Sequence, residues 1–403
     1  MCSTPSCAIL VKCGCRTPST HIIHRHDLAP VHRVIASFRR LDGRRVLRMI
    51  IAGAGVVMAI AALVALIAAA SGHDAARALT ALWHGSLGSR YAIFSATLVR
   101  ATPLILTGLA VALAFTAGVW NIGAEGQLLA GGTAATVIGL LTGPSLGWAS
   151  WPLSLAAGGI AGAAWAFLPA WLRRRFGVLE VISTIMMNFV ALYLVGYLVR
   201  GPLQEPLRIY PQSAPIPEVA RLPLLVDGAR LHVGFVLALL CAVGLWWGLL
   251  STAAGFRVRV AGSNADAARS AGLIDVGRTT MRAFLVSGLL AGLAGAVEVT
   301  GVTYSLYENL SPGYGYTAIA VALVGSLHPV LTVFSGVLFG ALEAGASAMQ
   351  RDAGVPSVLA TVVEASIILV VLGATAFRGA GLRQALRTRS RRQTRPDPLT
   401  EGS

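Results

Sequence analysis

Apolar stretches of about 20 residues, nearly free of charged side chains, recur along most of this chain. A stretch of that length lets a helix cross the hydrocarbon core of a bilayer, where the backbone must satisfy its own hydrogen bonds. With 55% hydrophobic and 12% charged residues, the 403-residue chain also has too little polar surface for a water-soluble globule. The sequence therefore predicts an all-α, polytopic membrane helical bundle of about ten transmembrane helices. The predicted spans are 49–70, 101–120, 122–142, 148–170, 178–199, 232–250, 283–303, 313–330, 331–349 and 356–376.

The basic residues predict how this bundle is oriented, because Lys and Arg near the ends of spans stay on the cytoplasmic side. Segments 1–48, 251–282 and 377–403 then face the cytoplasm. The run Arg173 to Arg175 lies there as well. Ten spans return both termini to the cytoplasm. The net charge of +15 follows from this bias and from contact with anionic lipid headgroups, so it indicates a lipid membrane and no nucleic acid as partner.

The two ends of the chain differ in composition from 49–376, which forms the predicted transmembrane domain. Residues 1–48 are expected to be a disordered basic extension, and 377–403 a basic tail. Four cysteines near the N-terminus lie close to histidines, but their spacing does not match paired zinc ligands. The sequence therefore predicts no metal site and no cofactor. The cysteines are Cys2, Cys7, Cys13 and Cys15.

The polar, arginine-bearing segment 251–282 separates two apolar runs and predicts a short capped helix outside the membrane. Asn264 can accept a hydrogen bond from the first helical turn, Asp266 suits the positive N-terminal end, and Gly272 suits a left-handed stop. The helix would be about two turns long, with small side chains that let the backbone of another protein come close. A docking site for a partner is one interpretation, and an ordinary cytoplasmic connection that caps well is the other.

The segment 118–127 places three glycines and three polar side chains, Asn121, Glu125 and Gln127, between two apolar runs. Lipid cannot solvate these groups, and non-helical backbone at membrane depth survives only inside protein or beside water. We therefore predict a helix break in the bundle interior. Its polar side chains either line a translocation pathway or satisfy the freed backbone groups of the break, and the sequence does not choose between these roles.

Few other polar groups fall within the predicted spans; they include Asn188, Glu298, Glu343 and Glu364. A carboxylate at this depth costs at least a few kcal/mol, so each is expected to have a partner or water. Glu298 precedes Tyr304 and further tyrosines at the external end of the seventh span, and such rings can stack on a sugar or a nucleobase. Anchoring at the membrane interface is the alternative role for these tyrosines.

Two blocks of four spans, 101–199 and 283–376, start from opposite sides of the membrane, as in an inverted-topology repeat. Each block has a break near its beginning, at 118–126 in the first and at 311–315 in the second. The segment 200–231 contains six prolines and predicts an ordered external loop. This loop is either a contact surface for a delivery protein or a plain connection.

The chain contains no glycine loop ending in Lys-Ser or Lys-Thr, no HExxH and no GxSxG motif. The sequence thus indicates neither an ATPase site nor a catalytic site. Any transport work would come from a helper ATPase or from an ion gradient. A membrane-embedded enzyme is disfavoured, because no paired catalytic groups cluster at one face of the predicted bundle.

The chain carries, in this order, LVRATPLILTGLAVALAFTAGVWNIGAEGQ (98–127), EVISTIMMNFV (180–190), GSNADAARSAGL (262–273) and LSPGYGYTAIAVALVGSLHP (310–329). Together these motifs resemble the membrane permease subunits of bacterial ABC importers for simple sugars and nucleosides. The resemblance covers residues 85–376, and the NIGAEGQ form is most similar to the nucleoside-importing branch.

The resemblance implies a permease subunit that pairs with a second permease, identical or related. It also implies two cytoplasmic ABC ATPases and an external solute-binding protein or lipoprotein. Such a subunit has no ATPase site of its own and imports nucleosides or related simple sugars by alternating access. An ion-coupled secondary transporter of small polar solutes is the alternative. The predicted pathway residues are Asn121, Glu125, Gln127, Asn188, Glu298 and Tyr304, and the predicted ATPase-coupling residues are Gly262, Asn264, Ala267, Ala268, Ala271 and Gly272.

Overall fold

A computed structural model of the protein confirms the predicted helical membrane bundle. Its described residues form helices and loops, with isolated β-bridges and no strand among them. Six helical segments in this part of the chain are long and apolar enough to cross a membrane, and the 53-residue segment Ala124–Phe176 contains two helices. Except for Met58, all described residues belong to one compact unit, Ile60–Ser403. The structure describes residues 58, 61–66, 68–70, 72–270, 272, 274–356, 358, 362, 365 and 366.

Of the eight predicted spans between residues 101 and 349, seven coincide with long helices and one does not. The predicted span 313–330 falls on α12, which has only 11 residues, about half the length that a helix needs to cross a bilayer. The predicted spans 49–70 and 356–376 lie largely outside the described residues, so the count of ten stays a prediction. The membrane helices and their connectors are α3 (Ala75–Ser86), η1 (Ala92–Thr97), α4 (Leu98–Thr116), α5 (Ala124–Leu146), α6 (Ser150–Phe176), α7 (Glu180–Arg200), α8 (Gly234–Ser251), α9 (Ala253–Ser263), α10 (Ala265–Ser270), α11 (Val276–Glu298), α12 (Tyr314–Val324) and α13 (Pro329–Asp352).

Local sequence fixes where several of these helices begin and end. The Asp74 carboxylate accepts a hydrogen bond from the Ala76 amide at 2.9 Å and starts α3, and Asp275 caps α11 in the same way at 2.8 Å from the Arg278 amide. The helix α6 ends at Gly177, whose φ of 67° is left-handed. Such caps satisfy backbone groups that would otherwise lack partners at helix ends.

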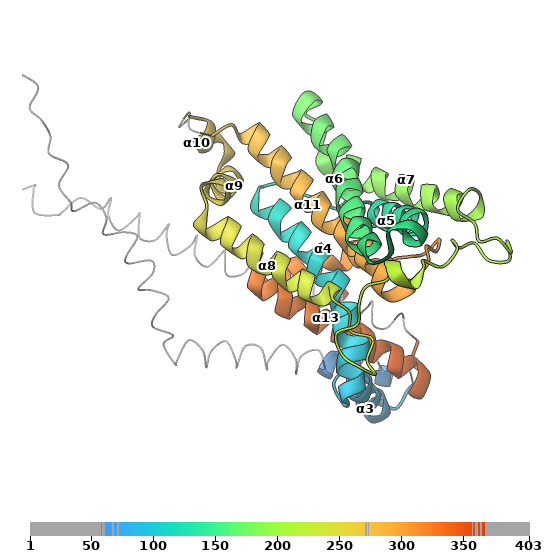
Figure 1. Cartoon of the computed structure of the whole chain (residues 1–403). Coiled ribbons are helices and arrows are strands. Elements are labelled where there is room, and N and C mark those ends of the chain that lie inside the picture. Colours follow the sequence, from blue (N-terminus) through green and yellow to red (C-terminus); the bar gives the residue numbers. More distant parts are fainter. Residues whose placement is uncertain are drawn as a thin grey trace, which may run out of the picture. The chain divides into compact units, whose positions relative to one another are not determined.

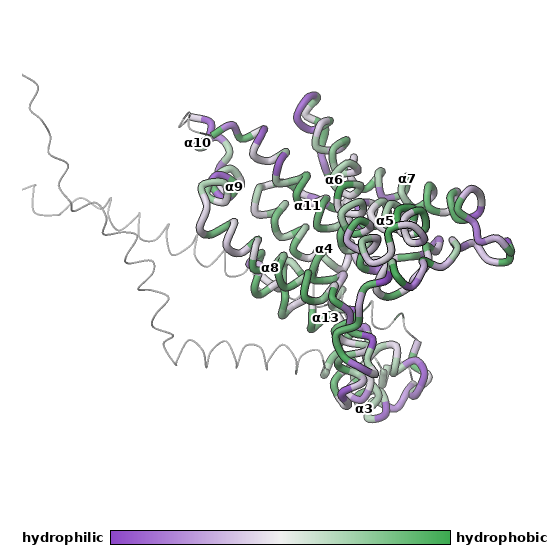
Figure 2. Tube along the Cα trace, viewed as in Figure 1, coloured by the Kyte–Doolittle hydropathy of each residue, from purple (hydrophilic) through white to green (hydrophobic). Residues whose placement is uncertain are grey.

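Helix α4 lies at the centre of the bundle. It packs against α8, α11, α12 and α13, and 83% of its most apolar window is buried, against 28% for α7 and 22% for α8. The short helices α9 and α10 lie beyond the ends of α8 and α11, whereas α3 lies at the other end of the bundle (Figure 1). Hydrophilic residues gather on α9, on α10 and at the end of α6, while the central helices are hydrophobic (Figure 2).

Close backbone contacts join α11 to α5 and α6. Gly292 lies against Gly158 and Gly162 of α6, and a Cβ at Gly292 would overlap the Gly158 carbonyl oxygen. Gly295 lies against the Leu128 carbonyl of α5 in the same manner. Small residues are common at helix contacts in membranes, because they let two backbones approach closely. These three helices therefore form a tightly packed layer beside α4.

The proline-rich segment 200–231 makes backbone hydrogen bonds to a distant part of the chain. Its Ile216 amide donates to the Tyr304 carbonyl at 2.8 Å, and its Leu222 amide donates to the Thr300 carbonyl at 2.9 Å. These bonds attach the loop to the chain that follows α11. Its role as a contact surface for a delivery protein stays a prediction.

Candidate functional site

The predicted break lies between α4 and α5. Helix α4 ends at Thr116 and α5 begins at Ala124, and Gly118 takes a left-handed φ of 73° that glycine adopts readily. The chain then runs through Asn121, which is 0% exposed. The structure thus places non-helical backbone in the protein interior, as the sequence predicts.

Asn121 uses every hydrogen-bonding position of its side-chain amide. Its Nδ2 donates to Gln127 Oε1 at 2.9 Å and to Ser287 Oγ at 2.8 Å. Its Oδ1 accepts from the Gly123 amide at 3.1 Å and from Gln127 Nε2 at 3.0 Å. An Asn side chain has two donors and can accept two bonds, so Asn121 has no free position for a solute in this conformation. Through Ser287, the network also ties the break to α11.

Asn188 ties α7 to the same break. Its Oδ1 accepts from the Gly126 amide at 2.8 Å, and its Nδ2 donates to the Ile122 carbonyl at 2.9 Å and to the Tyr316 hydroxyl at 3.2 Å. Both backbone groups belong to the break or to the first turn of α5, where no helical partner is available. Asn188 therefore supplies the bonds that an unbroken helix would have supplied.

The two breaks predicted in separate halves of the sequence touch each other. The Glu125 carboxylate accepts a hydrogen bond from the Gly315 amide at 2.7 Å. A Cβ at Gly315 would overlap the Glu125 backbone, so the first turns of α5 and α12 are in direct contact. A carboxylate at a helix N-terminus is favourable because the free amides carry partial positive charge. The inverted-topology repeat itself stays a prediction.

Four of the six predicted pathway residues are thus brought together, and two are not. Glu298 is buried in the last turn of α11, and one of its carboxylate oxygens lacks a hydrogen bond among the described residues. Tyr304 lies outside this helix and stacks under the Arg221 guanidinium, 4.6 Å from its ring centre. No hydrogen bond in the described part of the chain joins either residue to the break. The pathway role of all six stays a prediction.

The predicted capped helix is present as α10. The Asn264 Oδ1 accepts a bond from the Ala267 amide at 3.0 Å, and Gly272 takes a φ of 66° after the last turn. Asp266 pairs with Arg269 at 2.9 Å across one turn. These caps agree with the sequence, and the six residues of α10 make it slightly shorter than two full turns. Ala271 lies outside the described residues.

The two alanines expected on the docking surface point in different directions. Ala268 is only 2% exposed and packs with Ala261 and Val276 of the same chain. Ala267 is exposed. A partner can therefore reach Ala267 but not Ala268 in this conformation, because apolar packing inside the chain already covers the latter.

The segment 251–282 touches the break directly. Gly262, near the end of α9, lies so close to Thr116 that a Cβ would overlap its carbonyl oxygen and lie 2.8 Å from the Gly118 amide nitrogen. Only glycine at position 262 leaves room for this backbone contact. The sequence placed Gly262 and the break in separate motifs, and the structure joins them at one point.

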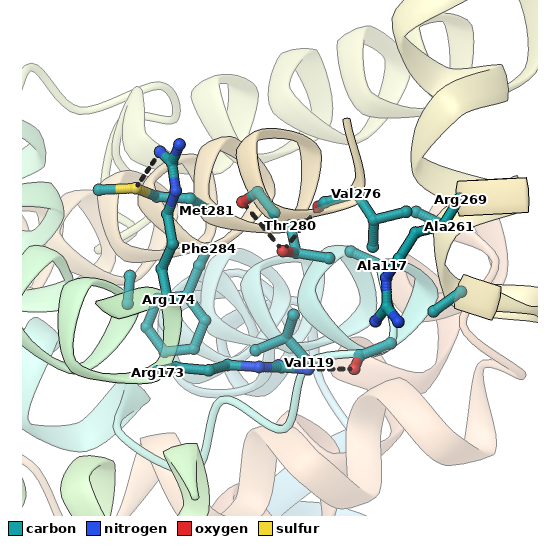
Figure 3. Close-up of a pocket in the computed structure, with 14 residues that line it drawn as sticks. Ala117, Val119, Arg173, Arg174, Ala261, Arg269, Val276, Thr280, Met281 and Phe284 are labelled. Atoms are coloured by element: carbon teal, nitrogen blue, oxygen red, sulfur yellow. Dashed lines mark hydrogen bonds between the residues drawn. The ribbon is translucent and has the colours of Figure 1, made fainter. Parts of the chain in front are cut away.

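Charged side chains reinforce this contact. Arg173 of α6 pairs with Glu180 of α7 at 2.9 Å and donates to the Gly118 carbonyl at 3.4 Å. The same Glu180 accepts a bond from the Trp120 amide at 3.2 Å. Beside this pair lies a cavity of about 240 Å³, and Figure 3 shows Arg173 and Arg269 among the side chains that line it. The start of the break is therefore held by α6, α7 and α9 together.

Three further side chains complete this site, and the sequence singled out only Tyr316, as one of the tyrosines that follow Glu298. Ser287 accepts a hydrogen bond from Asn121 Nδ2, and Tyr316 accepts one from Asn188 Nδ2. Glu180 links Arg173 to the break. Ser287 could have been noticed as a hydroxyl within an apolar span. The partners of Tyr316 and Glu180 leave no local signal in the sequence.

Comparisons with known proteins agree with this architecture. The family model described as branched-chain amino acid transport system / permease component matches residues 93–372. The chain is 41% identical over 321 residues to the guanosine ABC transporter permease protein NupP of Bacillus subtilis, covering 78% of this chain and 90% of that one. It is 40% identical over 294 residues to the glucose ABC transporter permease protein TsgB13 of Haloferax volcanii, covering 70% and 76%. It is 32% identical over 299 residues to the nucleoside ABC transporter permease protein NupB of Lactococcus lactis, covering 72% and 81%. No solved structure matches the chain.

The helices and the buried break define a multi-pass membrane protein. The chain belongs to the family of branched-chain amino acid transport system / permease components. The resemblance that the sequence motifs indicate is thereby confirmed.

Proposed function

We propose that this chain is the permease subunit of an ATP-driven importer that carries nucleosides into the cell by alternating access. The identity of 41% with a guanosine permease supports nucleosides as the solutes. The second candidate is a simple sugar, which the 40% identity with a glucose permease favours. The chain would lie in the inner membrane with both termini in the cytoplasm, next to a second permease. Two ATPases would bind from the cytoplasm, and an external binding protein would deliver the solute.

The contact between Gly262 and the break carries this proposal. A partner that pushes on the exposed face of α10 would move the end of α9, which meets the break through its backbone. Rigid elements in direct contact can pass a displacement between sites, whereas a flexible linker would absorb it. The break in turn holds the first turn of α5 against α12 and α7. Closure of the ATPases would therefore shift several membrane helices at once.

Gly262→Ala tests this coupling. The added methyl group overlaps the Thr116 carbonyl, so α9 must move away from the break. In proteoliposomes with the ATPase, we expect hydrolysis of ATP to continue while nucleoside uptake falls strongly. Gly244→Ala on α8 is the matched control, because its Cβ would meet nothing within 4 Å. Coupled uptake at the wild-type rate by folded Gly262→Ala protein would contradict the proposed coupling route.

An ion-coupled carrier is the alternative that the buried carboxylates favour. Glu298 has an oxygen without a partner among the described residues, and such a group can bind a cation or a proton. The two proposals differ in their energy source. Uptake measured with ATP and an ionophore together separates them, because an ATP-driven importer keeps its uptake under these conditions and an ion-coupled carrier loses it.

A further inference from the structure

One face of α7 is exposed along the whole helix. Only 28% of its most apolar window is buried. The exposed side chains recur every three or four residues, which places them on a single face. They include Ile182, Met186, Phe189, Tyr193 and Tyr197.

At the external end of this face lies a groove that also involves the segment after α11. The groove has a volume of about 370 Å³, which falls within the range of small-molecule sites. Tyr193 and Tyr197, which are 74% and 69% exposed, line it from α7. Glu308 and Asn309 line it from the other side. The groove thus combines two aromatic rings with a carboxylate and an amide.

The polar side of the groove is held in place. Glu308 pairs with Arg200 at 2.7 Å, which fixes one carboxylate oxygen. Its other oxygen would lie 3.3 Å from a Cβ at Gly196, so the carboxylate stands next to the surface of α7. The glycine leaves the floor of the groove open at this point.

The position of Tyr193 argues against contact with lipid alone. It lies seven residues before the end of α7 at Arg200, which corresponds to about 10 Å along the helix axis. Tyrosines that anchor a protein gather at the membrane interface rather than at this depth. The Tyr193 hydroxyl has no hydrogen bond within the described residues, and such a group is unfavourable in hydrocarbon. Water or a polar solute would satisfy it.

We infer that this groove binds the nucleoside in the external half of the translocation path, an inference that rests on the proposed function. The base stacks on Tyr193 or Tyr197, because every nucleobase offers a π-face to an aromatic ring. The ribose hydroxyls donate to the Glu308 carboxylate, and the Asn309 amide contacts the remaining polar edge.

Uptake kinetics test the stacking. Tyr193→Ala and Tyr197→Ala should each raise the KM for guanosine uptake at least about fivefold. Tyr193→Phe and Tyr197→Phe keep the aromatic ring and should keep the wild-type KM. Tyr91→Ala is the matched control, because Tyr91 is 64% exposed but lies outside the groove. Unchanged KM in both Ala variants would overturn the inference. A fall in kcat with unchanged KM, together with loss of the second permease on purification, would assign this face to subunit pairing instead.

Cysteine labelling tests the groove independently of transport. In the assembled importer, with the five cysteines of this chain replaced, Tyr193→Cys should react with a charged, membrane-impermeant thiol reagent added outside. Guanosine should slow that reaction and leave the labelling of Tyr91→Cys unchanged. An unreactive Tyr193→Cys in correctly inserted protein would show a lipid-facing side chain and overturn the inference, and so would labelling that guanosine does not affect. Failure of the proposed function would appear separately, as wild-type protein that takes up no nucleoside.

Discussion

The substitution Asn121→Ala separates the two roles left open for the polar break. In the structure Asn121 satisfies Gln127 Oε1, Gln127 Nε2 and the Gly123 amide. All of these groups are buried. Ser287 still donates to the Ala110 carbonyl at 2.6 Å, so it loses only the hydrogen bond that it accepts from Asn121. Three buried polar groups are therefore left without partners.

Each such group costs about 1–3 kcal/mol, so we expect Asn121→Ala to lower the free energy of unfolding by about 3 kcal/mol or more. Unfolding of the purified protein by SDS in mixed micelles measures this change. Ser287→Ala is the matched control, because it removes only one of the four Asn121 bonds and should cost about 1 kcal/mol. The double variant Asn121→Ala/Gln127→Ala should cost less than the sum of its single variants, since the unpaired Gln127 groups are then absent.

If Asn121→Ala protein is as stable as the wild type and transports solutes with an altered preference, the side chain lines the path. The bonds described above would then be made only while the path is closed.

Three further predictions follow from packing and charge. Ala267→Trp should leave the permease folded but abolish co-purification of the ATPase. Ala268→Trp should instead reduce the amount of folded protein, because only the Ala268 side chain is buried. If the two variants have the same effect on ATPase pull-down and on abundance in the membrane, this prediction is wrong. Gly315→Ala should destabilise the protein by about 1–3 kcal/mol, since its Cβ would overlap the first turn of α5, and thermal unfolding in detergent checks this. Burial lowers the pKa of His232, which lies two residues before α8, from 6.5 to about 4. Because the unfolded chain binds this proton more tightly, stability is complete above pH 6.5 and falls by about 3 kcal/mol as the pH drops to 4. His232→Phe should flatten that dependence in unfolding curves, and an unchanged slope would show that other groups cause it.

The features that the sequence predicted are those encoded by neighbouring residues. Hydropathy over about 20 residues identified the long helices, although it also predicted a full span where the chain forms only the short α12. The cap at Asn264 and the stop at Gly272 depend on bonds and dihedral angles within one or two turns. The glycines and polar side chains of 118–127 cannot continue an apolar helix in lipid, so the break was also visible.

The features that escaped prediction depend on contacts between distant residues. Asn121 meets Ser287 across 166 positions, and Asn188 meets Tyr316 across 128. No local pattern specifies such a pairing. The burial of Ala268 was missed for a different reason, because a helix of six residues is too short for its periodicity to show which face is covered.

We propose that this chain imports nucleosides with energy from a separate ATPase. The direct measurement is guanosine uptake into proteoliposomes that contain the permease pair, the ATPase and the binding protein, with and without ATP. We predict uptake that requires ATP and is unchanged by an ionophore that removes proton and sodium gradients. Uptake that continues without ATP and collapses with the ionophore would contradict the claim and identify an ion-coupled carrier.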